Sequence, residues 1–159
     1  MRNQLYQLLA VVMLLLTGTS CQEDFDKRYQ LTDNFIEFED AVTTTVAVGK
    51  DYPLLRKTVT AALEPVALQV NMTGTQFSSD QELRWQIVQE ESTAVQGRDY
   101  DLIDNQTVTL AANSSRTQVR IQPLATGESG TILVLELVGN DHIKPMENYK
   151  RVGIQWTFQ

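Results

Sequence analysis

Several residue types that often build functional sites are scarce in this sequence. It contains one cysteine, so it cannot form an internal disulfide. It contains one histidine, His142, which leaves few components for a histidine-based zinc site or a catalytic triad. The net charge is −7, and no basic cluster is longer than a pair such as Arg56-Lys57. Because phosphate binding needs a concentrated cationic face, we expect no nucleic-acid partner.

The apolar run near the N-terminus is short, and it ends before the only cysteine. Arg2 precedes an apolar stretch from Leu8 to Leu16, which falls short of the roughly 20 residues that a membrane-spanning helix needs. A charged start, a short apolar run and small polar residues are typical of a cleaved signal peptide. Gly18-Thr19-Ser20-Cys21 resembles a bacterial lipobox, with Gly18 where leucine is usual, as in looser boxes of Bacteroidota lipoproteins.

The lipobox resemblance implies that Cys21 is lipidated and becomes the first mature residue. The expected organisation is a lipoprotein signal peptide at 1–20, a lipidated flexible tether at 21–33 and one β-sandwich domain at 34–159. Two or more acyl chains anchor a protein stably where one does not. The acidic stretch after Cys21 also resembles the export signal of Bacteroidota surface lipoproteins, which implies an outer-membrane, cell-surface location. The alternative is an ordinary secretory signal that leaves a free thiol.

Alternation of apolar and polar residues predicts an all-β domain of about eight short strands. One face is apolar at Val66, Leu68, Val70 and Met72, and the run at 131–138 should be a central, widely buried strand. Residues 107–112 and 117–121 are expected to form a hairpin. Residues 57–63 are expected to be a strand or a turn of helix, with a strand favoured. The stretches 90–104 and 139–149 are expected to be loops. The pattern suggests an antiparallel sandwich or barrel. The remaining expected strands, including a β-branched run, are 34–39, 43–48, 65–72, 83–88 and 150–158.

Four short motifs in order resemble the Calx-β family. They are Ala94-x-x-Gly97-x-Asp99-Tyr100, Thr107-Val-Thr-Leu, Val119-Arg-Ile121, and Leu133-Val-Leu-Glu-Leu137, and together they cover the second half of the chain. The resemblance implies an antiparallel Greek-key β-sandwich that is immunoglobulin-like and Calx-β-like.

The calcium function of that family is not carried over. Its calcium-binding members have an acidic run after the Val-x-Ile strand, and residues 122–128 contain one acid, Glu128. Asp99, Asp101 and Asp104 remain as an oxygen-rich corner. The alternative is that Asp99 hydrogen-bonds its own turn and Tyr100 packs as a corner residue.

No set of residues points to catalysis, a cofactor or a metal. His142 lies in a predicted polar loop, and the chain has no Gly-x-Ser-x-Gly nucleophile motif. Trp85 and Trp156 lie in alternating strands and are expected in the core, whereas a sugar-stacking role is the alternative. The residues offered for exposed contacts are Tyr52, Tyr100 and Tyr149. The three Asn-x-Ser/Thr sequons, at Asn71, Asn105 and Asn113, matter only in a eukaryotic secretory route.

These features lead to three functional hypotheses. The first is a non-enzymatic, lipid-anchored surface protein that binds or assists in a glycan or peptide uptake complex, beside an outer-membrane transporter or a glycan-binding lipoprotein. The second is a structural adhesin or assembly subunit that pairs through exposed sheet edges. The third is an anchored hydrolase, which would need converging acids in a concave pocket. The first is preferred because the signal, the acidic tether and the strand order agree.

Overall fold

The computed structural model describes residues 33–159. The predicted signal peptide at 1–20, Cys21 and all but the last residue of the predicted tether lie outside the described residues. Among the described residues, no helix is long and apolar enough to cross a membrane.

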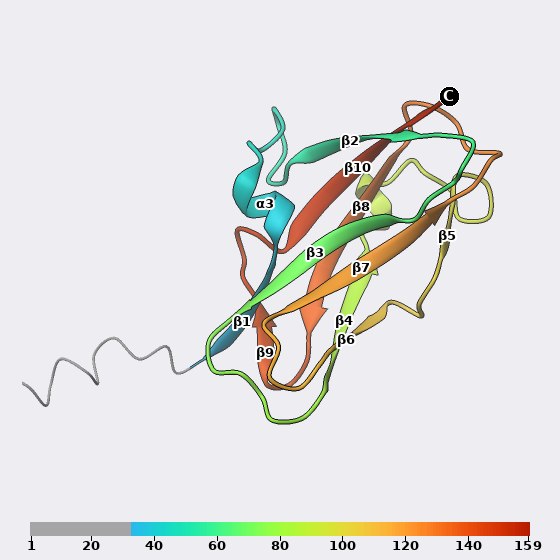
Figure 1. Ribbon diagram of the computed structural model, residues 1–159. Coiled ribbons are helices and arrows are strands. Elements are labelled where there is room, and N and C mark those ends of the chain that lie inside the picture. The colour runs from blue at the N-terminus through green and yellow to red at the C-terminus, as the bar shows by residue number, and fades with distance from the viewer. Residues whose placement is uncertain (1–32) are drawn as a thin grey trace, which may run out of the picture. The chain divides into compact units, whose positions relative to one another are not determined.

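Ten strands of residues 33–159 form two five-stranded sheets (Figure 1). The first sheet has the order β5-β7-β3-β1-β9, and the second has the order β2-β10-β8-β4-β6. Two pairings, β1 with β9 and β2 with β10, are parallel, and the others are antiparallel. The strands are β1 Asn34–Phe38, β2 Leu54–Val59, β3 Val66–Thr73, β4 Gln81–Ile87, β5 Tyr100–Leu102, β6 Thr107–Leu110, β7 Arg116–Pro123, β8 Ile132–Gly139, β9 Ile143–Pro145 and β10 Arg151–Phe158. Two short helical turns complete the structure, α3 at Glu39–Thr43 and the 3-10 turn η1 at Gln89–Glu91.

The core lies between the two sheets and is built from the alternating apolar positions of the strands. In β3, Leu68, Val70 and Met72 are buried, as the period-two pattern predicts. Strand β8 lies between β10 and β4 and is the most buried strand of its sheet, which confirms the predicted central strand. Trp85 and Trp156 are 3% and 0% exposed, so both belong to the core and neither forms a sugar-stacking surface.

The predicted strand at 43–48 is wrong. The chain instead forms α3, whose Ala41 is buried. Thr44–Val46 and Val48 are exposed, and no strand of residues 33–159 pairs with them. The Thr43 hydroxyl donates a hydrogen bond to the Glu39 carbonyl at 2.9 Å and closes this turn. A β-branched run forms a strand only where a neighbouring strand pairs with it, and within the described part of the chain none does.

The predicted strand at 57–63 is shifted. Strand β2 begins at Leu54, directly after Pro53, and residues 60–63 form a turn in which the Leu63 N–H donates to the Thr60 carbonyl at 3.0 Å. Pairing with β10 sets where β2 begins. The Gly153 N–H donates a hydrogen bond to the Pro53 carbonyl, and proline can take part in this pairing because it has a carbonyl acceptor although it lacks an N–H.

The predicted hairpin of 107–112 and 117–121 is also wrong. Strand β6 pairs with β4, whereas β7 lies in the other sheet between β5 and β3. Leu110 and Val119 are both buried and reach the core from opposite sheets. Two further strands, β5 and β9, lie in stretches predicted as loops, because three residues are too few to show an alternating pattern.

Candidate binding site

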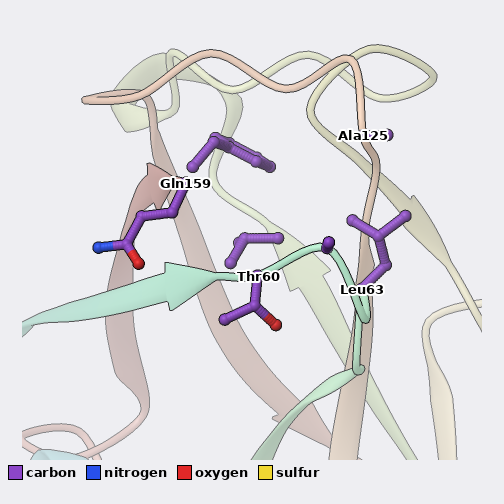
Figure 2. Close-up of a pocket in the computed structure, with 7 residues that line it drawn as sticks. Thr60, Leu63, Ala125 and Gln159 are labelled. Atoms are coloured by element: carbon purple, nitrogen blue, oxygen red, sulfur yellow. The ribbon is translucent and has the colours of Figure 1, made fainter.

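A small apolar pocket lies at the end of the sandwich where β2 and β10 finish. Its volume is about 230 Å³. Figure 2 shows Thr60, Leu63, Ala125 and Gln159 around it. This volume is below the ~300 Å³ at which small-molecule sites usually begin. The pocket therefore suits one apolar side chain better than a sugar or a cofactor. Three further residues complete the lining: Val59, Ala61 and Phe158.

The pocket walls are held by contacts from both sheets. The Gln122 side-chain amide on β7 donates to the Leu63 carbonyl at 2.6 Å, and Leu63 has a left-handed backbone with a φ of 47°. On the opposite wall the Phe158 ring lies against Gly127, where an added Cβ would be 2.0 Å from the ring. The chain therefore needs a glycine at 127 to admit this ring.

One edge of the second sheet, formed by β2, is open along its length. In a parallel pair, each residue turns its N–H and C=O to the same side. The Pro53 and Val59 carbonyls accept bonds from β10, so Leu55 and Lys57 also face β10. Leu54, Arg56 and Thr58 consequently turn their backbone groups outward, and β2 has no second partner strand among residues 33–159.

Arg56 and Lys57 place two positive charges on this edge. Arg56 is exposed, and Lys57 is half-buried opposite Trp156 of β10. Within residues 33–159 neither forms an ion pair, unlike Lys50, Arg98 and Arg151. The edge is therefore locally cationic on a chain of net charge −7.

A separate charged cluster centres on Glu91, which contacts the loop that precedes β2. Glu91 Oε2 accepts hydrogen bonds from Lys50 Nζ at 3.0 Å and the Tyr52 hydroxyl at 2.9 Å, and Arg151 Nη1 lies 3.6 Å from Oε1. Lys50 also lies over the Tyr52 ring at 5.6 Å. The hydrogen bonds from Lys50 and Tyr52 lower the pKa of Glu91, and burial raises the pKa of Tyr52. These charges neutralise one another, so the cluster ties the loop before β2 to Arg151 at the start of β10.

The buried carboxylate of Asp99 ties two other loops together. Its oxygens accept hydrogen bonds from the Val95 N–H at 2.7 Å, the Glu128 N–H at 2.8 Å and Arg98 Nη2 at 2.8 Å. Burial alone would raise the pKa of Asp99, but the hydrogen bonds from Arg98, Val95 and Glu128 outweigh it and lower the pKa. The bond to Val95 confirms that Asp99 hydrogen-bonds its own turn, and Tyr100 packs as a buried corner residue.

The other residues singled out from the sequence do not converge. Asp101 and Asp104 are exposed, and among residues 33–159 no three His, Cys, Asp or Glu side chains gather to hold a metal. His142 is exposed in the turn before β9, with its ring 6.5 Å from that of Phe77. Cys21, the predicted lipidation site, lies outside the described residues.

The proposed exposed role of the tyrosines is wrong for two of them. Tyr52, in the loop before β2, and Tyr100, the first residue of β5, are 1% and 2% exposed, so both rings are buried. Tyr149 is half-buried against the core. The pocket and the open edge of β2 could not be predicted from the sequence. The pocket residues come from three separate segments, and only the Arg56-Lys57 pair gave a local sign of the edge.

The two sheets form a β-sandwich whose fold is similar to that of Calx domains in solved structures. The crystal structure of CBD12 from CALX1.2 is similar with a TM-score of 0.52 at 11% identity, over 78% of this chain and 44% of that one. The apo-form Calx CBD1 domain gives a TM-score of 0.51 at 14% identity, over 79% of this chain and 98% of that one. The calcium binding domain CBD12 of CALX1.1 gives a TM-score of 0.52 at 12% identity, over 79% of this chain and 44% of that one.

This likeness in structure establishes the fold, as the four sequence motifs predicted. The chain spans less than half of the two CBD12 structures. No protein-family model and no curated protein matches the sequence.

Proposed function

We propose that this protein is a lipid-anchored, non-enzymatic binding or accessory module at the cell surface. In this proposal it serves a nutrient uptake complex beside an outer-membrane transporter or a glycan-binding lipoprotein. The observation that carries the placement is the signal-like segment that ends at Cys21. A lipid on Cys21 holds the sandwich at the membrane and leaves its loops and edges available to a partner.

The arrangement of polar side chains supports a binding role over catalysis. Catalysis by an acid, base or nucleophile needs such groups to converge on a substrate cavity. In residues 33–159 the buried carboxylate of Asp99 is used by three donors, Glu91 is neutralised by Lys50 and Arg151, and His142 stands alone at the surface. The pocket at the end of β2 is lined mainly by apolar groups. These are the features of a scaffold that binds through its surface.

A structural adhesin or assembly subunit is the second candidate. The open edge of β2 favours it, whereas Arg56 and Lys57 on that edge count against pairing with another copy. Three other edges weigh against broad sheet-to-sheet assembly. Strands β5 and β9 have three residues each, and β9 ends in Pro145. The Thr109 carbonyl of β6 accepts a hydrogen bond from the Thr117 hydroxyl at 2.8 Å. One open edge fits a single partner better than a polymer.

The proposal is tested by the intact mass of the protein isolated from membranes, compared with Cys21→Ser. We expect a mass gain from acyl chains in the native protein and its loss in Cys21→Ser. Protease added to whole cells should remove the native protein while a periplasmic marker stays intact. An unmodified protein released into the medium would overturn the anchor and the surface placement together.

Co-purification tests the uptake part of the proposal. After chemical cross-linking of whole cells, the native protein should bring down an outer-membrane transporter, and Cys21→Ser should not. Recovery of a fibre-forming surface subunit in its place would favour the second candidate.

A further inference from the structure

We infer that the free edge of β2 and the adjacent pocket form one site for an extended, acidic peptide segment of a partner protein. The segment adds a strand beside β2 and inserts an apolar side chain into the pocket. This inference rests on the proposed function, since it names the chemistry that a surface binding module would recognise.

The backbone of β2 supplies the first part of the recognition. Leu54, Arg56 and Thr58 offer three N–H and three C=O groups along the free edge, alternating at the strand repeat. An added strand pairs with such groups, and main-chain hydrogen bonds give it affinity that does not depend on its sequence. Arg56 and Thr58 are exposed, so a peptide reaches them without displacing another element of residues 33–159.

The pocket supplies the second part because it begins where β2 ends. Val59 is the last residue of β2 and lines the pocket, and Thr60 and Ala61 continue its wall. Figure 2 shows β2 leading directly into Thr60 and the pocket. A peptide that follows β2 therefore brings one end to the pocket mouth. The pocket holds about 230 Å³ and accepts an apolar side chain, which fixes the register of the added strand.

The two cations on the edge decide the charge of the occupant. Neighbouring residues of a strand point to opposite faces, so Arg56 and Lys57 meet successive side chains of an added strand. Carboxylates at those positions complement both cations, which have no ion-pair partner among residues 33–159. A second copy of this chain is disfavoured, because antiparallel pairing of β2 with itself places these like charges together.

Selection from a display library of linear decapeptides, against the full chain held in detergent, tests the inference. We expect enriched peptides with at least two acidic residues and one apolar residue toward one end. The most enriched decapeptide, synthesised, is then titrated against the native chain and its variants. Arg56→Glu should weaken its binding by at least about tenfold, and Ala61→Phe, which fills the exposed pocket mouth, should do the same.

Arg120→Glu is the matched control. Arg120 is exposed on β7 of the other sheet and also has no ion-pair partner among residues 33–159, so its reversal changes the net charge equally. Binding to Arg120→Glu should match the native chain within about twofold. Thermal unfolding of each variant shows that a loss of binding does not come from a loss of fold.

Three outcomes would overturn the inference. They are no enrichment over the Arg56→Glu chain, enriched peptides without carboxylates, and equal binding to Ala61→Phe and the native chain. A concentration-dependent dimer that Arg56→Glu abolishes would instead assign the edge to a second copy. None of these results changes the mass of the lipidated protein, so the inference can fail while the proposed surface anchoring holds.

Discussion

The backbone N–H of Glu128 donates a hydrogen bond to the buried carboxylate of Asp99 at 2.8 Å, across 29 positions of the chain. The same carboxylate accepts the Val95 N–H and the Arg98 guanidinium. One side chain therefore joins the turn before β5 to the loop between β7 and β8. That loop also carries Ala125, which lines the pocket.

Replacing Asp99 should destabilise the domain strongly. Asp99→Ala removes the acceptor of two part-buried backbone N–H groups, those of Val95 and Glu128, and the partner of Arg98. We expect a loss of about 3 kcal/mol in the free energy of unfolding. Chemical denaturation measures it. Asp104→Ala is the control, because Asp104 is exposed in the same region, and it should change stability by under ~0.5 kcal/mol. Equal effects of the two variants would contradict a stabilising role for the Asp99 hydrogen bonds.

The stability of the domain should fall in acid. The pKa of Asp99 is lowered in the folded state, so the unfolded chain binds its proton first as the pH drops. The stability that Asp99 contributes is present above the ordinary pKa of an aspartate, about 3.9. It is lost as the pH falls through the lower pKa that Asp99 has in the folded state. The lowered pKa of Glu91 acts in the same direction.

Urea denaturation between about pH 5 and pH 2 measures this effect. Asp99→Asn should reduce the slope of stability against pH. Glu37 gives the opposite sign, because burial and then the nearby Glu39 raise its pKa. Its contribution is present at low pH and lost as the pH rises through the folded pKa, so Glu37→Gln should steepen the acid loss. A slope unchanged in both variants would refute these assignments.

Gly139 should tolerate a side chain poorly. Its φ is 76°, and an added Cβ would lie 2.1 Å from the Ile143 carbonyl oxygen, which is backbone and cannot turn away. We expect Gly139→Ala to cost at least about 2 kcal/mol of stability. Gly49 has a nearly equal φ of 75° with nothing within 4 Å, so Gly49→Ala isolates the backbone term at about 1 kcal/mol. Thermal unfolding of both variants should rank them in that order, and the reverse order would reject the close approach at Ile143.

The Tyr52 hydroxyl should contribute to stability through Glu91. Tyr52→Phe keeps the buried ring and removes the donor of the 2.9 Å hydrogen bond, and we expect a loss of about 1 kcal/mol. Tyr149→Phe is the comparison, because within residues 33–159 its hydroxyl makes no side-chain hydrogen bond. Denaturation midpoints that shift equally for the two variants would show that the Glu91 contact adds nothing.

The fold class and most strand faces could be predicted from the sequence. Alternation placed Leu68, Val70 and Trp85 in the core. For Asp99 and Tyr100 the sequence left two interpretations open, and the structure bears out the turn with a buried corner, not an exposed Tyr100. The run at 43–48 was wrongly predicted as a strand, because its β-branched residues have strand propensity but no strand of residues 33–159 lies beside them. Local patterns also cannot tell which sheet a strand joins, so β6 and β7 were predicted as one hairpin.

The sequence by itself determined which side of each strand faces inward, because side-chain direction alternates with a period of two along any strand. The tertiary structure alone decided which strands lie at edges, since pairing joins residues far apart in the chain. Strand β2 is an edge strand because β10 covers one of its sides and no other strand of residues 33–159 covers the second. The pocket exists only because the ends of β2, β10 and the β7–β8 loop meet at one end of the sandwich.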